Sequence, residues 1–152
     1  MANDPGRVLF LCTGNYYRSR FAEVWFNHLA TASGVVWRAD SAGLRIDTQQ
    51  RHNVGPMSRN AVAALRQRSI DPETHLRAPR AVTGEDFAGA DRVVALLRAE
   101  HEPMIRRAFV GVADQVSYWD IRDVPPSAGY DPMAEIDRRV RVMLAELGGL
   151  PA

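Results

Sequence analysis

Short apolar runs alternate with amphipathic stretches along this chain. The unbroken run at residues 8–11 is typical of a strand buried on both faces, as in a parallel sheet. Further runs at 35–39, 93–97 and 115–119 predict three more strands. The segment 43–57 has little periodicity and many polar residues, so we predict a loop there.

Apolar residues at helical spacing occupy most of the chain between these runs. One helix starts near Ser19, and Ser58 is the predicted N-cap of a second. Asp131 and a first-turn Pro132 start the last helix, which the glycines at 148–149 end. The predicted apolar faces are Ala22, Trp25, Phe26 and Leu29 (with Arg20, Glu23 and Asn27 opposite); Ala61, Val62 and Leu65; Met104, Ile105, Ala108 and Phe109; and Ile136, Val140, Met143, Leu144 and Leu147.

This alternation of strands and helices predicts an α/β fold with a four-stranded parallel sheet flanked by helices on both faces. We expect residues 1–152 to form one domain, in which the polar residues 1–6 are a flexible tail. In such sheets ligands bind at the carboxyl ends of the strands. The end of the run at 8–11 is therefore the first candidate site.

The only cysteine of the chain, Cys12, stands at that end. Thr13, Gly14 and Asn15 follow as a tight turn, and Arg18 comes just before a helix. Backbone N–H groups of a loop that enters a helix bind anions, and the arginine adds a fork for two phosphate oxygens. The positive electrostatic field of these N–H groups and of the arginine also stabilises a cysteine thiolate. A lone cysteine is usually an inert core residue, but this order of elements favours a nucleophile that attacks a bound phosphoryl group.

The stretch from Val8 to Ser19 resembles the signature loop of the low-molecular-weight protein tyrosine phosphatase family, and an Ala-Glu pair follows it as in that family. The segments 40–43 and 82–87 resemble two further family motifs, so the likeness covers nearly the whole chain. The resemblance implies a flavodoxin-like sheet and catalysis through a phosphocysteine, without metal or cofactor. It implies that the phosphate-binding residues are Thr13, Gly14, Asn15, Tyr16, Tyr17, Arg18 and Ser19.

A phosphatase of this kind needs a proton donor for the leaving oxygen. In the family, the acid lies in an Asp-Pro dipeptide followed by an aromatic residue, shortly after the last strand. Asp131 has the proline but also suits a helix N-cap, whereas Asp123 has the distance from the strand but no following proline. We favour Asp123, because distance decides where a carboxyl group can reach. Asp131 is the alternative and Asp120 a third candidate.

The resemblance also implies supporting residues. Ser19 can donate a hydrogen bond to the nucleophilic sulfur and stabilise it as a thiolate. The loop asparagine of the family is held by a serine and a histidine, which correspond to Ser41 and His75 here. The stretch after His75 is about two residues longer than in the family, so this histidine is equally well interpreted as a surface residue.

Four aromatic or basic residues depart from the family pattern. Tyr17 stands where many relatives have a second cysteine, which excludes a protective disulfide with the nucleophile. Tyr16 lies at the pocket wall, where it could stack on a phosphotyrosine ring or narrow the entrance. Arg20 replaces the usual proline, and Tyr130 is the nearest substitute for the aromatic residue that follows the acid.

Composition narrows the choice further. A net charge of +1 without a basic run argues against a nucleic-acid partner. All 19 residues counted as Lys or Arg are arginine. The absence of lysine excludes Schiff-base catalysis and the nucleotide-binding P-loop motif, which both need a lysine. One cysteine suits the cytoplasm, and no apolar segment is long enough for a membrane. No histidine has the spacing of a metal site.

We therefore expect a metal-independent phosphomonoester hydrolase, a protein tyrosine phosphatase in which Cys12, Arg18 and Asp123 are catalytic. Its partners would be a phosphotyrosine protein as substrate and a phosphate or sulfate-like anion in the loop. Two alternatives stay open. One is a binding module for phosphorylated ligands that has lost turnover, suggested by the altered surroundings of Asp123. The other is an arsenate reductase, which shares the fold but needs further cysteines.

Overall fold

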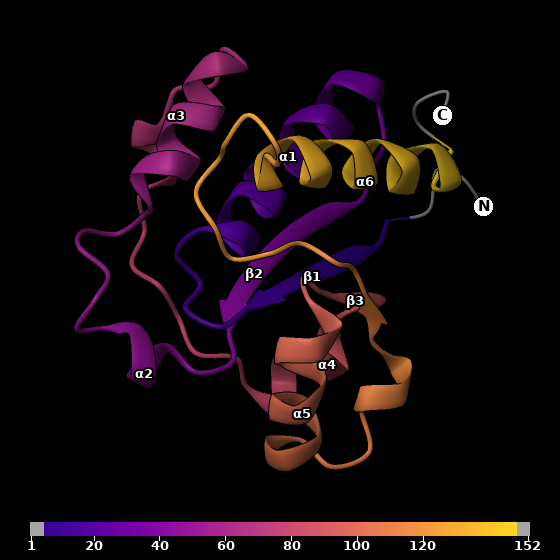
Figure 1. The fold of residues 1–152 in the computed structure, drawn as a ribbon. Helices are drawn as coiled ribbons and strands as arrows, with labels where there is room; N and C mark the ends of the chain where they lie inside the picture. Colours follow the sequence, from indigo (N-terminus) through magenta and orange to yellow (C-terminus); the bar gives the residue numbers. More distant parts are fainter. Residues whose placement is uncertain (1–4, 149–152) are drawn as a thin grey trace.

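The structure, a computed structural model, describes residues 5–148, which are built around one sheet of four parallel strands (Figure 1). Its strands are β1 (Arg7–Cys12), β2 (Arg38–Gly43), β3 (Arg92–Ala95) and β4 (Ser117–Tyr118), in the order β2-β1-β3-β4. This order is flavodoxin-like, with the first strand of the chain inside the sheet. The predicted fold class is confirmed.

Helices cover both faces of the sheet (Figure 1). One face carries α1 (Arg18–Ser33), α3 (Arg59–Gln67) and α6 (Pro132–Glu146). The opposite face carries α4 (Gly84–Gly89) and α5 (Arg98–Ala108). The connections contain the single-turn helix α2 (Ile46–Gln49) and the 3₁₀ turns η1 (Pro72–His75) and η2 (Ala113–Gln115).

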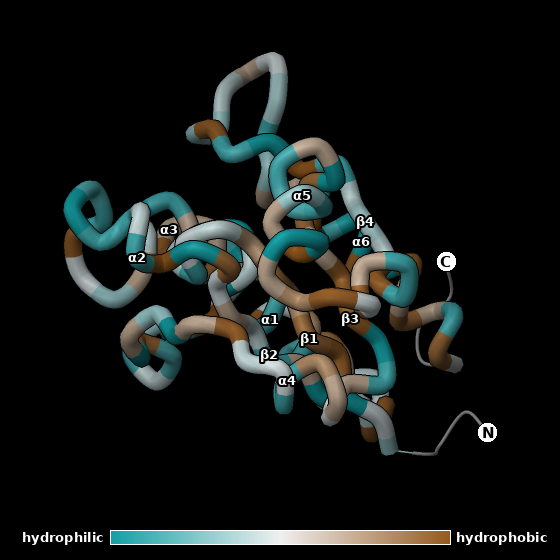
Figure 2. Tube along the Cα trace, turned by 90° about the horizontal axis from the view of Figure 1, so that it is seen from below, coloured by the Kyte–Doolittle hydropathy of each residue, from teal (hydrophilic) through white to brown (hydrophobic). Residues whose placement is uncertain are grey.

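Strand β1 divides its side chains between two cores. Val8 and Phe10 pack with residues of α1, α3 and α6, and Leu9 and Leu11 pack with residues of β3 and α5. All four are at most 3% exposed, and full burial of such a side chain stabilises the fold by about 1.5–3 kcal/mol. Figure 2 shows β1 and β3 as hydrophobic segments among more hydrophilic loops. Cys12, the last residue of β1, is thereby held at the carboxyl edge of a rigid sheet.

The second strand begins later than its apolar residues predict. Residues 35–39 were expected to form it, but β2 runs from Arg38 to Gly43 and includes the polar Ser41. Val35 instead belongs to the end of α1, where Gly34 has a φ of 73° and the N–H of Val35 donates to the carbonyl of Ala30 (2.9 Å). An apolar residue in this position is common after a helix that ends with a left-handed glycine.

Helix α1 is buried on more sides than its pattern predicts. Arg20, expected on the polar face, is only 1% exposed, and Glu23 and Asn27 are half-buried. The side-chain amide of Asn27 pairs with both backbone groups of Ala39 on β2, at 3.0 and 2.7 Å. The predicted polar face is therefore an interface with the sheet edge and the loops around it.

Several local predictions are confirmed. Ser58 caps α3 by accepting from the N–H of Asn60 (3.1 Å), and the apolar face predicted for α6 is buried. In α5 the predicted face is only partly right, because Ile105 is fully buried whereas Ala108 is exposed.

Most of the predicted tail, residues 1–4, lies outside the described residues, and so does one of the two final glycines. Gly6 is buried, and its carbonyl accepts from Arg38 N–H (3.0 Å). Within residues 5–148, no helix has the length and apolar character needed to cross a bilayer.

Candidate active site

The loop between β1 and α1 encloses a small cavity of about 40 Å³ at the carboxyl edge of the sheet. Cys12 lines the cavity and is 3% exposed. The residues that line the cavity come from the loop, from the segment around α2 and from the segment after β4: Cys12, Thr13, Gly14, Tyr16, Tyr17, Arg18, Gln49, Asn53 and Asp123.

The sulfur of Cys12 is hydrogen-bonded to Ser19. The Cys12 Sγ and Ser19 Oγ atoms are 3.0 Å apart, and the amide of Asn15 donates to the same Oγ at 2.9 Å. Because Ser19 Oγ accepts from Asn15, its own proton is free to point at the sulfur. The hydroxyl of Ser19 is therefore placed as a donor to the Cys12 sulfur.

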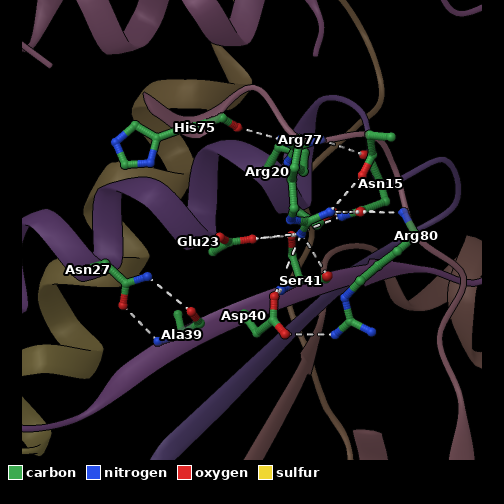
Figure 3. Close-up of polar contacts among 12 residues, drawn as sticks. Asn15, Arg20, Glu23, Asn27, Ala39, Asp40, Ser41, His75, Arg77 and Arg80 are labelled. Carbon is green, nitrogen blue, oxygen red and sulfur yellow. Dashed lines mark hydrogen bonds and ion pairs between the residues drawn. The ribbon is translucent and has the colours of Figure 1, made fainter. Parts of the chain in front are cut away.

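Asn15 organises the loop from its centre (Figure 3). It is fully buried and has a φ of 49°, a left-handed conformation that asparagine tolerates better than most residues. Its NH₂ group donates to Ser19 Oγ and Ser41 Oγ, both at 2.9 Å. Its Oδ1 accepts from Arg77 Nη1 and from the backbone N–H of Arg80, both at 3.0 Å. All four hydrogen-bonding positions of the amide are used.

The structure brings Ser41 to Asn15 as predicted, but not the side chain of His75. The imidazole of His75 lies away from Asn15, and only its backbone carbonyl takes part, accepting from Arg20 Nη2 at 2.7 Å (Figure 3). The guanidinium of Arg77 occupies the predicted histidine position. The side chain that reaches Asn15 therefore stands two positions after His75.

Two buried or half-buried arginines, Arg20 and Arg77, hold together the segments that pack behind the loop between β1 and α1. Arg77 Nη2 donates to Glu23 Oε1 and to the backbone carbonyl of Ser41, each at 3.0 Å. Arg20 donates to the carbonyl oxygens of Pro56 and His75, in two separate loops. Burial, followed by the positive charge of Arg77, lowers the pKa of Arg20 to about 10, so it keeps its charge at neutral pH. No local sequence pattern indicates these roles of Arg20 and Arg77.

Arg18 is 2% exposed and is held from two sides. Its Nη1 donates to the carbonyl of Ile121 (2.9 Å), and its Nη2 donates to Glu100 Oε2 (2.8 Å). Burial disfavours the charged form, but the negative charges of Cys12 and Glu100 outweigh it, and the pKa of Arg18 is raised. The guanidinium is therefore a fixed cation at the loop.

Glu100 and His101, at the start of α5, form the second part of this support. Glu100 Oε2 also accepts from Thr13 Oγ1 and from His101 Nε2, the latter at 3.0 Å. Burial alone would raise the pKa of Glu100, but the hydrogen bonds from His101, Arg18 and Thr13 hold it well below its usual range. His101 Nδ1 accepts from the N–H of Leu97, which places the ring proton on Nε2, and burial lowers its pKa. In the sequence, only the position of Glu100 and His101 shortly after the third predicted strand could have indicated that they lie near the site.

The three candidate acids differ in position. Asp123 lines the cavity with Cys12, is 57% exposed, and its Oδ2 is 3.9 Å from Arg18 Nη2. Asp131 accepts from the N–H of Met133 (2.9 Å) as N-cap of α6 and is not part of the cavity lining. Asp120 is exposed and likewise outside the lining.

The two tyrosines of the loop tie it to different segments. Tyr16 donates to the carbonyl of Val54 (2.5 Å), and Tyr17 donates to the carbonyl of Val124 (3.0 Å). Burial, with smaller contributions from the charges of Asp131 and Asp123, raises the pKa of Tyr17. Both side chains are therefore part of the walls around the cavity. Residues 5–148 contain no cluster of three or more side chains suited to hold a metal ion.

The sheet order and the loop define a class of protein, an α/β protein in which a cysteine and an arginine line a small cavity at the carboxyl edge of the sheet. The family model described as low molecular weight phosphotyrosine protein phosphatase matches residues 7–123. The chain belongs to this family, whose members are cysteine-dependent phosphatases. A comparison with curated protein sequences found no match.

Several solved structures have the same fold as this chain. The low molecular weight protein tyrosine phosphatase from T. tengcongensis is 28% identical with a TM-score of 0.77, over 93% of this chain and 99% of that one. A YwlE mutant from Bacillus subtilis is 25% identical with a TM-score of 0.73, over 94% and 99%. Wzb from Vibrio vulnificus, solved with benzylphosphonate, is 14% identical with a TM-score of 0.71, over 93% and 98%, which shows the fold alone.

Proposed function

We propose that this protein hydrolyses phosphomonoesters without a metal ion, through a phosphocysteine, and that its substrates are phosphotyrosine proteins. The observation that carries the proposal is the Cys12 sulfur, 3.0 Å from Ser19 Oγ, in a cavity that Arg18 also lines. A sulfur with a hydrogen-bond donor on one side and a fixed cation nearby is suited to attack a dianion.

In the first step, the Cys12 thiolate attacks phosphorus and the bond to the ester oxygen breaks. Arg18 and the loop N–H groups stabilise the negative charge on the transferring group. Asp123, protonated, gives its proton to the leaving oxygen, which departs as an alcohol or phenol. The products of this step are phosphocysteine, the free hydroxyl compound and the Asp123 carboxylate.

In the second step, water hydrolyses the phosphocysteine. The Asp123 carboxylate takes a proton from the attacking water, and the sulfur leaves as a thiolate that the Ser19 hydroxyl stabilises. Inorganic phosphate is released and the acid is protonated again. Because the free Cys12 thiol must stay reduced for each cycle, we place the protein in the cytoplasm.

Geometry supports Asp123 rather than Asp131 as the acid. Asp123 is a cavity-lining residue with an exposed carboxyl group that can approach a substrate oxygen. One oxygen of Asp131 is engaged in capping α6, at 2.9 Å from the N–H of Met133. Removing that cap would destabilise the helix, by about 0.5–2 kcal/mol, without removing the proton donor.

Phosphoarginine is a second candidate substrate. The cavity is lined by Gln49, Asn53 and Asp123, whose oxygens can accept hydrogen bonds from a guanidinium, and by the aromatic Tyr16. The YwlE arginine phosphatase, solved with a phosphorylated active-site serine, shares the fold at 24% identity and a TM-score of 0.73, over 93% of this chain and 95% of that one. We favour phosphotyrosine because of the family to which the chain belongs.

Hydrolysis of phenyl phosphate in EDTA tests the reaction, with wild type, Cys12→Ser, Asp123→Asn and Asp131→Asn. We expect turnover in wild type, none in Cys12→Ser, and a loss of about 10²- to 10⁴-fold in Asp123→Asn when the leaving group needs a proton. Phosphate binding without turnover would identify a binding module instead. Reduction of arsenate with an external thiol would identify an arsenate reductase.

A panel of matched peptides carrying phosphotyrosine, phosphoserine or phosphoarginine then tests the substrate class. We expect the highest kcat/KM for phosphotyrosine. A clear preference for phosphoarginine would contradict the proposed substrate while leaving the cysteine mechanism in place.

A further inference from the structure

Tyr17 connects the phosphate loop directly to the segment that carries Asp123. Its side chain comes from the position just before Arg18, is 9% exposed, and donates a hydrogen bond to the carbonyl of Val124 at 3.0 Å. Val124 is the residue after Asp123. One tyrosine hydroxyl thus spans from the anion site to the backbone next to the proposed acid.

The chain around Asp123 has firm attachments on one side only. Before it, the N–H of Ile121 donates to the carbonyl of Leu96 (2.8 Å), and the carbonyl of Ile121 accepts from Arg18. After it, the next backbone hydrogen bond within the described part of the chain is that of Ser127 N–H, which reaches only as far as Tyr130 in the same turn. Arg122 N–H donates to Tyr130 Oη (3.1 Å) within the same segment, and Asp123 Oδ2 lies 3.9 Å from Arg18 Nη2. Among the described residues, the bond from Tyr17 is therefore the hydrogen bond that ties residues 123–127 to the loop after β1.

We infer that Tyr17 is a positioning residue for the general acid: it holds the Asp123 carboxyl group where it can protonate the leaving oxygen. This inference rests on the proposed function of Asp123. The tether joins the two groups that act on opposite ends of the breaking bond, because Tyr17 belongs to the loop that binds the phosphoryl group. Loss of the hydroxyl should leave phosphate binding intact and loosen the acid.

The test compares kcat/KM of wild type and Tyr17→Phe on two aryl phosphates, because kcat/KM reports formation of the phosphocysteine. Phenyl phosphate releases a basic phenolate that needs a proton, whereas 2,4-dinitrophenyl phosphate releases a stable anion that does not. We expect Tyr17→Phe to lose about two- to tenfold on phenyl phosphate, the worth of one hydrogen bond, and nothing on the dinitrophenyl ester. Inhibition by inorganic phosphate should be unchanged. In an Asp123→Asn background the same substitution should have no further effect.

Tyr118→Phe is the matched control, because Tyr118 also donates from a half-buried hydroxyl to a backbone carbonyl, that of Ala113 at 3.0 Å, outside the cavity. It should leave the ratio between the two substrates unchanged. An equal loss on both esters in Tyr17→Phe, or weaker inhibition by phosphate, would show that Tyr17 supports the loop and would overturn the inference. If Asp123→Asn loses the same kcat/KM on both esters, Asp123 is not the acid and the proposed function of this residue fails. If Asp123→Asn loses more on phenyl phosphate but Tyr17→Phe does not, only the positioning role of Tyr17 is rejected.

Discussion

Glutamine in place of Glu100 removes a negative charge that supports Arg18 without changing the shape of the side chain. Three donors converge on Glu100 Oε2: Arg18 Nη2 at 2.8 Å, His101 Nε2 at 3.0 Å and Thr13 Oγ1. In Glu100→Gln the guanidinium of Arg18, which is 2% exposed, keeps a neutral acceptor but loses its countercharge. We expect the folded protein to become less stable, because a buried cation then loses its nearest countercharge.

The size of the effect follows from burial. Breaking a fully buried ion pair from one side costs about 3–5 kcal/mol. Glu100 is 27% exposed, and glutamine can still accept one or two of the three hydrogen bonds, so we expect a loss of about 2–3 kcal/mol in the free energy of unfolding. With a urea m-value of about 2 kcal/mol/M, the midpoint should fall by roughly 1–1.5 M.

Urea denaturation at pH 7 measures this difference, and a pH series checks its origin. The pKa of Glu100 is lower in the folded protein than its ordinary value of 4.5. Its contribution is therefore fully present above about pH 4.5 and is lost as the pH falls toward the folded-state pKa, because only the unfolded chain takes up the proton. The gap between wild type and Glu100→Gln should be largest at neutral pH and shrink in acid.

Glu146→Gln is the control, since Glu146 pairs with Arg92 at 3.4 Å while both side chains are largely exposed. Such a surface pair contributes at most about 1 kcal/mol. If Glu100→Gln is no less stable than Glu146→Gln, or if its deficit is the same at pH 7 and in acid, the ion pair with Arg18 does not stabilise the fold as reasoned here.

Three further substitutions test the loop and its support. Gly43→Ala should impair phosphate binding and lower the melting temperature, because a Cβ there would lie 2.8 Å from the backbone oxygen of Thr13 in the loop after β1. The control is Gly84→Ala, where nothing lies within 4 Å of the added Cβ, and its melting temperature should be close to that of wild type. In urea denaturation, Arg77→Ala should lower the free energy of unfolding by about 2 kcal/mol or more. His75→Ala should lower it by less than about 0.5 kcal/mol, because only the backbone of His75 takes part. The reverse ranking would mean that the His75 side chain, and not Arg77, supports Asn15. Asn15→Ala should be less stable than Asn15→Gly by about 1 kcal/mol, because alanine resists a φ of 49°; equal stability would refute this strain.

Local signals in the sequence were enough to predict the centre of the fold. The apolar run at 8–11 became β1, the cysteine and turn after it became the loop, and α1 follows directly. Asp131 and Ser58 cap their helices as predicted. These features depend on residues within a few positions of one another, so the order of residue types is sufficient to indicate them.

The second strand and the buried face of α1 show the limits of local patterns. Apolar residues at 35–39 predicted a strand, but Val35 completes the end of a helix and the strand includes polar residues near the site. Arg20 has the spacing of a solvent-exposed residue, yet the two loops that accept its hydrogen bonds bury it. Burial on the polar side of a helix depends on what the rest of the chain places there.

By itself, the sequence determined that a cysteine, a turn and an arginine lie together at the start of a helix. Only the tertiary structure decided what holds them: Glu100 for Arg18, Arg77 for Asn15 and Tyr17 for the segment after Asp123. These partners are 82, 62 and 107 positions apart along the chain. Their pairing depends on the path of loops whose lengths no periodicity encodes, because a buried charge or amide accepts whichever partner the folded backbone brings within hydrogen-bond distance.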